Sequence, residues 1–452
     1  MPEPIISVSG LRGIIGQTLT PEVALRFACG FAADLPPGKI VVTRDGRATG
    51  PMLADAIRSG LAAVGRDVLD AGIAATPTTG VLVRTTGAAG GIQISASHNP
   101  PEYNGIKLFS RAGRVIPKAD GEQTIARYRA GQISWQSHDQ LGAVQPAGDT
   151  ITEHCRLVLA TVDVERIRQR RFRVLLDANH GAGSLLGRRL LDELGCQTTL
   201  LGEPPDGHFE HPPEPTAENL AGVLTSVVQA GCDIGFCQDP DADRLAIIDE
   251  HGRYLGEEYT LALCVDHVLR SRDAVRGPSG PIVTNCSTSR MSEDLALRHG
   301  VPFYRSAVGE ANVVDCMLKQ GALLGGEGNG GAIDPRVGLV RDSFVGMALV
   351  LDAMAARQMP ISRLAEELPR YEIVKTKITL ANDQVPAALA RLERHFADAT
   401  IDCLDGMRFD WPGKWLLVRA SNTEPIVRAI AEAGSHQEAA RLCQVAAEVV
   451  MG

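Results

Sequence analysis

The first residue of this chain whose surroundings favour chemistry is a serine at the end of an apolar run. The β-prone residues 91–94 lead into the segment 95–100, Ser-Ala-Ser-His-Asn-Pro, and a second such run begins at Tyr103. A turn at the end of a strand presents its side chains where a ligand can reach them. We therefore predict an accessible hydroxyl at Ser97, although a serine before a turn more often serves only as a cap.

Three aspartates at alternate positions form a second candidate site. Asp239, Asp241 and Asp243 lie between the strand-like residues 234–237 and 245–248. Their hard carboxylate oxygens suit Mg²⁺, which keeps some coordination sites for water or phosphate oxygen. In a flat strand these carboxylates would be about 6.5–7 Å apart, so the loop has to curve if they share one ion. The alternative is a solvated acidic turn, which the mutual repulsion of three charges disfavours.

Of two other motifs considered for this acidic loop, one is excluded and one is disfavoured. An EF-hand would use Glu250 at its twelfth position, but Arg244 stands where that motif needs glycine, and residues 245–248 are typical of a strand. A phosphatase of the haloacid-dehalogenase type is disfavoured because Asp243 stands where its motif prefers threonine or valine.

A glycine-rich segment, residues 325–331, presents one carboxylate and one amide, at Glu327 and Asn329. Glycines allow close approach of the backbone, and both side chains can form hydrogen bonds with sugar hydroxyls. No Lys-Ser/Thr pair follows, so the segment is not a P-loop. An ordinary connecting loop explains it equally well.

A segment near the C-terminus favours anion binding. A strand-like run ends at Arg419, three small hydrogen-bonding residues follow at Ser421, Asn422 and Thr423, and Arg428 lies beyond them. Such side-chain donors and backbone N–H groups can form a cradle for an anion. A helix cap or an Asx-turn is the alternative, but the two arginines favour phosphate.

The elements that position these segments alternate between strand-like and helix-like periods, which predicts an α/β protein. Helices are expected over residues 21–33, 51–64, 184–194, 259–269, 289–299, 313–318, 344–356 and 386–396, and from 437 onward. Strands are expected over residues 39–43, 67–71, 172–177, 234–237, 245–248, 281–284, 375–380 and 415–419.

Length and composition limit the class of protein. A chain of 452 residues is expected to form two to four domains. Its net charge of −9 argues against broad binding of nucleic acid or of an anionic membrane. We see no signal peptide, and Asp352 interrupts the most apolar late stretch, so we expect no membrane span. The ten cysteines form no CxxC pair and predict reduced thiols in a cytoplasmic protein.

In this order the segments resemble the α-D-phosphohexomutase superfamily, which includes phosphoglucomutases, phosphomannomutases and phosphoglucosamine mutases. Residues 97–100 resemble its phosphoserine loop, 239–244 its metal loop, 326–331 its sugar loop and 419–425 its phosphate loop; residues 9–13 resemble its N-terminal signature. The resemblance covers essentially the whole chain. It implies three similar α/β domains with mixed sheets and a smaller C-terminal α+β domain around a central cleft. Their expected limits are residues 1–150, 151–254, 255–368 and 369–452.

The resemblance also implies a mechanism. Ser97, as phosphoserine, would donate its phosphoryl group to a hexose monophosphate, and the resulting hexose 1,6-bisphosphate would turn in the cleft and return its other phosphoryl group. One Mg²⁺, bound by Ser97, Asp239, Asp241 and Asp243, would neutralise charge on the transferring group. A hexose 1,6-bisphosphate is the implied activator.

Further roles follow from the same resemblance. Arg12, Lys107 and Arg244 are suited to stabilising the phosphoryl group or handling the proton, with Lys107 as the predicted general base. His98 would orient the serine loop, or is merely structural. The implied substrate-binding residues are Glu327, Asn329, Arg419, Ser421, Asn422, Thr423 and Arg428.

The chain departs from the family pattern at several positions. Pro240 and Ala242 replace glycines of the metal loop. In the sugar loop the usual Ser-Gly-His is replaced by Asn-Gly-Gly, which ends at Gly331, and Glu310 stands where a histidine or lysine is common. Because these two positively charged side chains of the family are absent, the identity of the substrate and of one acid/base group stays open. The run that begins at Ser421 resembles the phosphomannomutase/phosphoglucomutase version.

We therefore predict a cytoplasmic, Mg²⁺-dependent phosphohexomutase that interconverts hexose 1- and 6-phosphates. Glucosamine phosphate is the main alternative substrate. Two further functions stay open: a hexose-phosphate binding protein without turnover, and a phosphatase that transfers the phosphoryl group to water. The expected partner is a small sugar phosphate, with no nucleic acid and no membrane, and the protein is expected to be a monomer or a homodimer.

Overall fold

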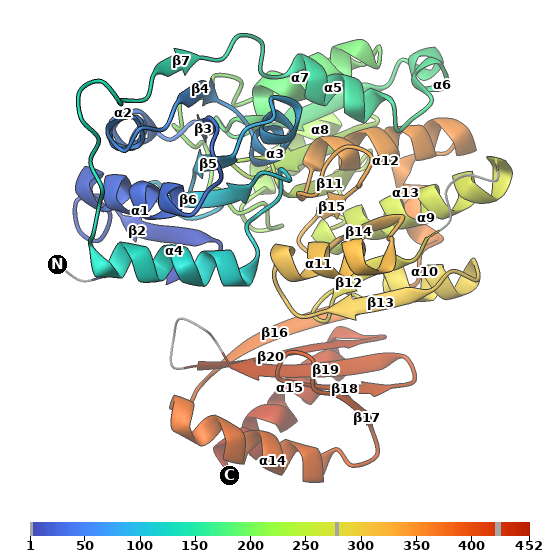
Figure 1. The fold of residues 1–452 in the computed structure, drawn as a ribbon. Helices are drawn as coiled ribbons and strands as arrows, with labels where there is room; N and C mark the ends of the chain where they lie inside the picture. Colours follow the sequence, from blue (N-terminus) through green and yellow to red (C-terminus); the bar gives the residue numbers. More distant parts are fainter. Residues whose placement is uncertain (1–2, 276–279, 421–425) are drawn as a thin grey trace.

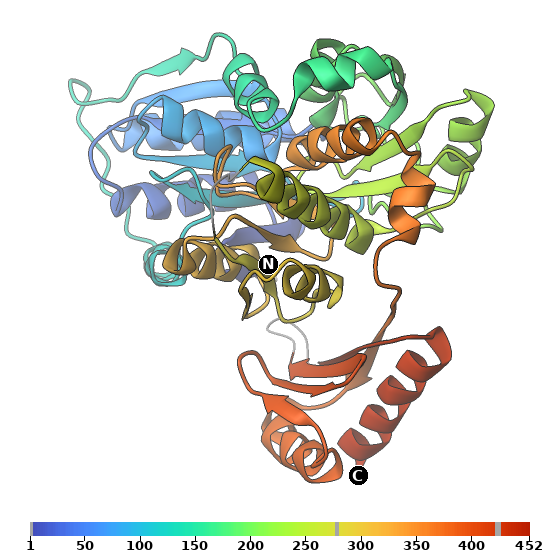
Figure 2. The same ribbon diagram turned by 90° about the vertical axis from the view of Figure 1, so that its right-hand side faces the viewer.

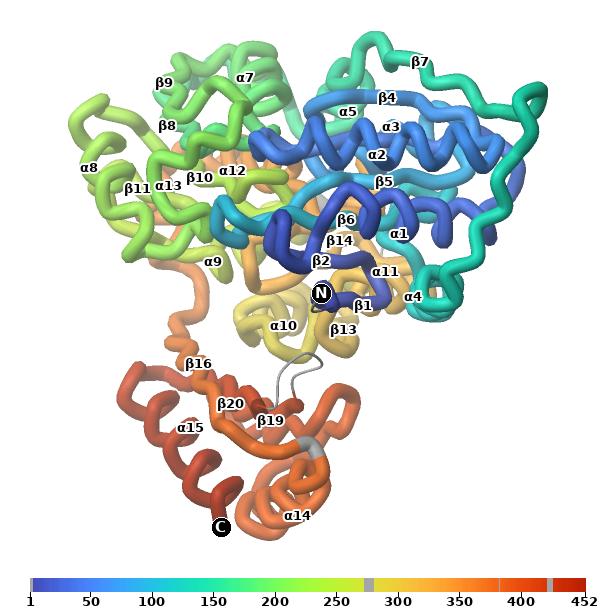
Figure 3. The backbone as a smooth tube through the Cα atoms, turned by 90° about the vertical axis from the view of Figure 1, so that its left-hand side faces the viewer, coloured from blue at the N-terminus to red at the C-terminus, as the bar shows by residue number. Residues whose placement is uncertain are grey.

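The computed structural model describes residues 3–275, 280–420 and 426–452, in which the chain builds four units, each around its own β-sheet (Figure 1). Units I and II lie side by side, and unit IV lies at one end of the molecule, beyond unit III (Figures 1 and 3). Three α/β units and a smaller C-terminal α+β unit confirm the predicted fold class. The limits expected at 150, 254 and 368 fall in connections between elements, and they stay predictions.

Unit I contains a mixed seven-stranded sheet in the order β1-β2-β6-β5-β3-β4-β7. Its strands are β1 Ile5–Ser7, β2 Gly10–Ile14, β3 Ile40–Arg44, β4 Val68–Ile73, β5 Gly90–Ile94, β6 Tyr103–Ser110 and β7 Val144–Pro146. Its helices are α1 Pro21–Ala33, α2 Gly50–Ala63, α3 Thr76–Thr85 and α4 Lys118–Ala130. The Thr20 side chain caps α1 by accepting from the Val23 N–H, as Thr-Pro at a helix start predicts.

Unit II contains a four-stranded sheet in the order β11-β10-β8-β9. Its strands are β8 Arg173–Asp177, β9 Gln197–Leu201, β10 Ile234–Gln238 and β11 Leu245–Asp249, and its helices are α5 Thr152–Leu159, α6 Val164–Arg170, α7 Gly183–Glu193 and α8 Ala221–Gln229. Every residue of the antiparallel pair β10 and β11 is buried, which explains their continuous apolar runs. The acidic loop connects these two strands.

Unit III contains a four-stranded sheet in the order β13-β12-β14-β15. Its strands are β12 Ile282–Asn285, β13 Phe303–Ser306, β14 Leu324–Glu327 and β15 Gly331–Ile333. Its helices are α9 Glu257–Val275, α10 Met291–Arg298, α11 Glu310–Gln320, α12 Ser343–Arg357 and α13 Ile361–Glu366. Helix α12 is buried from Ser343 to Ala355 and packs against α5, α6 and α7 of unit II, so units II and III share one hydrophobic core.

Unit IV is an antiparallel sheet in the order β16-β20-β19-β18-β17. Its strands are β16 Glu372–Thr379, β17 Thr400–Asp402, β18 Met407–Trp411, β19 Lys414–Ala420 and β20 Ile426–Ala433; its helices are the short η1 Asn382–Gln384, α14 Val385–His395 and α15 His436–Met451. Helices α14 and α15 cover the sheet face that turns away from unit III (Figures 1 and 2). None of the helices within the described residues is long and apolar enough to cross a membrane.

Several helices of the structure were not predicted, namely α3, α4, α5, α6, α8 and α13. For α3 the sequence argues against a helix. Its first residues are Thr-Pro-Thr-Thr-Gly, which have low intrinsic helix propensity. The first eight residues of the helix are nevertheless buried, and the helix packs against β3 and β5. Tertiary burial therefore outweighs local propensity here.

A buried polar chain connects units I, II and III. The Thr78 hydroxyl lies 2.9 Å from His154 Nδ1, and His154 Nε2 lies 2.7 Å from Asp342 Oδ2. Asp342 also caps α12, because its Oδ1 accepts from the backbone N–H groups of Phe344 and Val345. A buried polar group that loses its partner is costly, so this chain helps to fix the relative positions of the three units.

We expect Asp342→Ala to lower the free energy of unfolding by about 2–4 kcal/mol, because it removes a helix cap and leaves His154 without its acceptor. The matched control is Asp163→Ala, which removes the cap of α6 and an exposed ion pair with Arg166 but no buried partner, and should cost about 1 kcal/mol. Thermal and urea unfolding of both variants measures the difference. Equal losses in the two variants would contradict a stabilising role for the buried chain.

Candidate active site

The ends of β5 and β10 bring the predicted serine and the acidic loop together. Ser97 follows β5 and has a φ of 51°, in the left-handed region that few non-glycine residues adopt. The expected accessible hydroxyl is wrong for this arrangement of the units, because Ser97 is 1% exposed and lies against the acidic loop of unit II. Its Oγ donates a hydrogen bond of 2.6 Å to Asp239 Oδ2, although the two residues are 142 positions apart. The nucleophile candidate of unit I and the metal-site candidate of unit II therefore meet in one place.

Arg47 of unit I, which no sequence pattern indicated, holds the backbone of the serine loop. Its side chain is 2% exposed and forms an ion pair with the buried Asp45. Its terminal nitrogens donate to the carbonyl oxygens of Ser97, Asn99, Pro100 and Tyr103 at 2.5–2.9 Å. Asp45 also accepts from Ser95 Oγ, whose oxygen accepts from the Ser97 N–H. The only available signal was an Asp-Gly-Arg turn after a strand.

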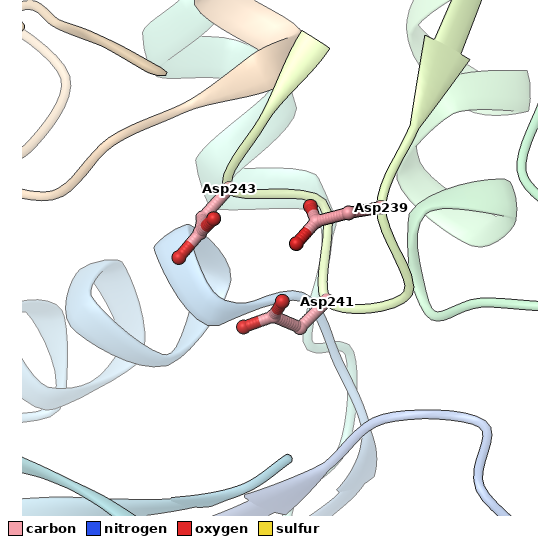
Figure 4. A group of neighbouring side chains, drawn as sticks. All are labelled: Asp239, Asp241 and Asp243. Carbon is pink, nitrogen blue, oxygen red and sulfur yellow. The ribbon is translucent and has the colours of Figure 1, made fainter. Parts of the chain in front are cut away.

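The acidic loop is curved, as a shared ion would require, and its three aspartates converge. Asp239, Asp241 and Asp243 are fully buried, and one carboxylate oxygen of each lies within 4.8 Å of the others. Their carboxylates face one common space (Figure 4). Ala242 bends the loop, with a φ of 55°. Oδ1 of Asp241 and Oδ1 of Asp243 are buried and find no hydrogen-bond partner among the described residues, so a bound cation would satisfy them.

Buried cations compensate the charge of this loop. Lys107 Nζ lies 2.5 Å from Asp241 Oδ2 and 2.8 Å from Asp243 Oδ2, and Arg341 donates to Asp243 Oδ2 at 2.7 Å. Burial and the two neighbouring carboxylates raise the pKa of Asp239 well above its usual value. Burial alone would raise the pKa of Asp243 as well, but Arg341, Lys107 and Arg244 lower it below its usual value. Asp243 therefore stays ionised near pH 7.

The other predicted catalytic residues surround this pair of loops. Arg12 Nη1 donates to Asn99 Oδ1 at 3.1 Å, and Arg244 Nη1 lies 3.9 Å from carboxylates of Glu214 and Glu257. Burial, Arg244 and Arg12 lower the pKa of His98 to about 2. His98 is therefore neutral near pH 7, which favours the orienting role over that of a proton donor.

Lys107 is the predicted general base, but its contacts favour the charged form. Burial alone would lower the pKa of Lys107, whereas Asp241 and Asp243 raise it above its usual value. It therefore keeps its proton while it contacts both aspartates. The assignment as general base stays a prediction.

Glu327 ends β14 and is fixed by three donors. Its Oε1 accepts from Asn285 Nδ2 at 2.7 Å and from the Gly309 N–H at 3.2 Å, and its Oε2 accepts from Arg341 Nη1 at 2.9 Å. The glycine-rich loop is shorter than expected, because Gly325 and Gly326 belong to β14. Within the loop, Asn329 Oδ1 is buried and without a hydrogen-bond partner among the described residues. Asn329 Oδ1 is therefore available to a ligand, whereas the Glu327 carboxylate is bonded within the protein; the sugar contacts of both residues stay predictions.

The predicted phosphate-binding arginines lie on unit IV. Arg419 of β19 and Arg428 of β20 are directly opposite each other in the sheet. Arg419 Nε lies 3.1 Å from Asp405 Oδ2, which also accepts from the Val308 N–H of unit III at 3.0 Å. Among the described contacts, those of Arg419 reach Asp405 rather than the metal loop. Ser421, Asn422 and Thr423 fall outside the described residues.

Three α/β units that bring together a serine, an acidic loop and a carboxylate-bearing loop, with a smaller α+β unit beyond them, define an enzyme of the phosphohexomutase class. Comparison with known sequence families agrees. The phosphoglucomutase/phosphomannomutase families match as alpha/beta/alpha domain I over residues 5–132, domain II over 152–252, domain III over 257–371 and the C-terminal domain over 376–449. The chain belongs to the phosphoglucomutase/phosphomannomutase family.

The sequences of individual relatives align with nearly the whole chain. It is 39% identical to "Phosphoglucomutase/phosphomannomutase" of Thermococcus kodakarensis, over 95% of this chain and 94% of the relative. It is 33% identical to "Probable phosphoglucosamine mutase" of Methanopyrus kandleri, over 96% of this chain and 95% of that relative. The crystal structure of a phosphoglucomutase/phosphomannomutase family protein from Burkholderia thailandensis is similar, with a TM-score of 0.86, 27% identity, and coverage of 99% of this chain and 98% of that one.

We expect Mg²⁺ to stabilise the protein against thermal unfolding, because it would bind the unpartnered oxygens of the acidic loop. At a concentration one hundred times the dissociation constant, which calorimetric titration supplies, the gain should be about 2.7 kcal/mol. Asp243→Asn should remove most of this gain. The control Asp334→Asn changes a buried aspartate that pairs with Arg336 and should keep it. A gain that survives Asp243→Asn would argue that the ion binds elsewhere.

Proposed function

We propose that the protein is a phosphohexomutase that interconverts hexose 1-phosphate and hexose 6-phosphate through a phosphoserine at Ser97 and a hexose 1,6-bisphosphate intermediate. The observation that carries this proposal is the 2.6 Å hydrogen bond from Ser97 Oγ to Asp239, which joins the hydroxyl to a buried trio of carboxylates. Family membership supports the reaction class.

The proposed reaction has two transfers. The phosphoryl group on Ser97 passes to the free hydroxyl of a hexose monophosphate; the serine O–P bond breaks, a sugar O–P bond forms, and the hydroxyl gives up its proton. The bisphosphate then turns, and its other phosphoryl group returns to Ser97. Ser97, Asp239, Asp241 and Asp243 would hold one Mg²⁺, which supplies charge neutralisation for the transferring group.

Charged residues around the loop would assist each transfer. Arg12 and Arg244 are proposed to stabilise the phosphoryl oxygens, and neutral His98 to orient the serine loop. Lys107 is proposed as the general base. For this role it has to release Asp241 and Asp243, which a cation bound to those carboxylates would favour by reducing their attraction for the ammonium group.

Substrate binding is proposed to use two separate loops. Glu327 and Asn329 would contact the sugar hydroxyls, and the segment from Arg419 to Arg428, including Ser421, Asn422 and Thr423, would hold the phosphate that does not react. In the structure Asp405 occupies the position beside Arg419. An incoming phosphate would replace that carboxylate as the partner of the guanidinium.

The preferred sugar is proposed to be glucose or mannose, with glucosamine as the alternative. Relatives that cover the chain bear both kinds of name, with the higher identity for the phosphoglucomutase/phosphomannomutase. We find no support for a binding protein without turnover. The test compares glucose, mannose and glucosamine 1-phosphates with Mg²⁺ and a bisphosphate primer. Release of inorganic phosphate without isomerisation would identify a phosphatase instead.

Ser97→Ala should abolish mutase turnover and leave the fold intact, because it removes one hydroxyl and only the hydrogen bonds of that hydroxyl. The assay follows conversion of hexose 1-phosphate to hexose 6-phosphate, with circular dichroism as the measure of folding. The exposed Ser137→Ala is the matched control and should keep full activity. Appreciable turnover by the Ser97 variant would remove this residue from the nucleophile role.

Arg419→Ala should weaken substrate binding by about 1.5–3 kcal/mol, the usual worth of a hydrogen bond to a charged group. The KM for the hexose phosphate should therefore rise about ten- to a hundredfold. Arg441→Ala, which changes an exposed arginine of α15 in the same unit, is the control. An unchanged KM in the Arg419 variant would contradict the phosphate-binding assignment.

A further inference from the structure

One buried arginine outside the predicted site residues lies between the sugar loop and the metal loop. Arg341 precedes α12, and its side chain is 11% exposed. Its Nη1 donates to Glu327 Oε2 at 2.9 Å and its Nη2 donates to Asp243 Oδ2 at 2.7 Å. Its Nε and its backbone N–H donate to the two carboxylate oxygens of Glu310, at 3.3 Å and 3.0 Å. One guanidinium therefore contacts three buried carboxylates.

The surrounding backbone leaves room for this side chain. Gly331 begins β15 beside Arg341, and a Cβ added there would lie 2.4 Å from Arg341 Cδ and 2.8 Å from its Cβ. Any larger residue at 331 would therefore displace the stem of the arginine. Gly331 and Glu310 are also the two positions where the sequence lacks an expected cation. Arg341 contacts both, so the positive charge in this part of the site comes instead from a side chain two residues before α12.

The geometry points to Arg341 as a positioning residue for sugar recognition, which holds the Glu327 carboxylate in one orientation by anchoring it to Asp243 and Glu310. This inference rests on the proposed function, because it needs Glu327 to contact the sugar. An arginine suits the task because its planar fork donates in fixed directions to several carboxylates at once. A lysine has the same charge but a single ammonium group, and cannot span Glu327, Asp243 and Glu310 together.

The test measures binding in the absence of turnover. The full chain with Ser97→Ala and saturating Mg²⁺ is titrated calorimetrically with glucose 1-phosphate and, separately, with inorganic phosphate. The same titrations are made after adding Arg341→Gln, Arg341→Lys or Gly331→Ala. Arg336→Gln is the control, because Arg336 lies in the same connection between β15 and α12 and pairs with Asp334 instead.

We expect Arg341→Gln to weaken glucose 1-phosphate binding at least about tenfold and to leave inorganic phosphate binding within about twofold, since the loss concerns the sugar contact. Arg341→Lys should restore only part of the affinity, and Arg336→Gln should change neither titration. Gly331→Ala should reproduce the arginine variant without removing any charge. Equal losses for both ligands would overturn the inference, because they would make Arg341 a phosphate-binding residue.

A double-mutant cycle separates positioning from a general effect on folding. Glu327→Gln should weaken glucose 1-phosphate binding when Arg341 is present and have little further effect in the Arg341→Gln background. Additive losses would overturn the inference. Failure of the proposed function is a different result: the Ser97→Ala parent would then bind no glucose 1-phosphate, and the unmodified protein would show no mutase turnover.

Discussion

The site depends on the burial of three carboxylates in one short loop. Asp239, Asp241 and Asp243 are withdrawn from water, and such a cluster is stable only where positive charge lies close to it. Lys107 from unit I and Arg341 from unit III supply that charge, so the acidic loop of unit II is stabilised by its neighbours on both sides. Charge compensation therefore fixes the chemistry of the site and the arrangement of the units together.

The rest of the framework makes this arrangement rigid. Units II and III share a hydrophobic core through α9 and α12, and the Thr78–His154–Asp342 chain connects that core to unit I. Arg47 then holds the serine loop through four backbone carbonyls. The nucleophile candidate is thus positioned by backbone contacts, while the metal-site candidate is positioned by charge.

Much of this could be predicted from the sequence. Apolar runs such as β10 and β11, and the Thr-Pro start of α1, carry local signals, and the four loops stand out because each ends a strand. Helix α3 could not be predicted, because burial rather than propensity forms it. Arg47 and Arg341 were missed for another reason: their partners lie far away in sequence, and an isolated arginine near a strand or helix end carries no pattern. The sequence showed that positions 310 and 331 lack the cationic side chains common in the family. It did not show that Arg341 supplies a positive charge beside both positions.

Unit IV lies beyond unit III and is joined to it by one connection, residues 367–371 (Figure 2). Its contacts with unit III include hydrogen bonds from Arg408 to the Cys286 carbonyl and from the Arg290 N–H to Glu432. A short tether keeps a binding group at a high effective concentration even when its direct contacts open. Were unit IV to open from unit III, this tether would keep Arg419 and Arg428, the residues proposed to bind phosphate, close to unit III.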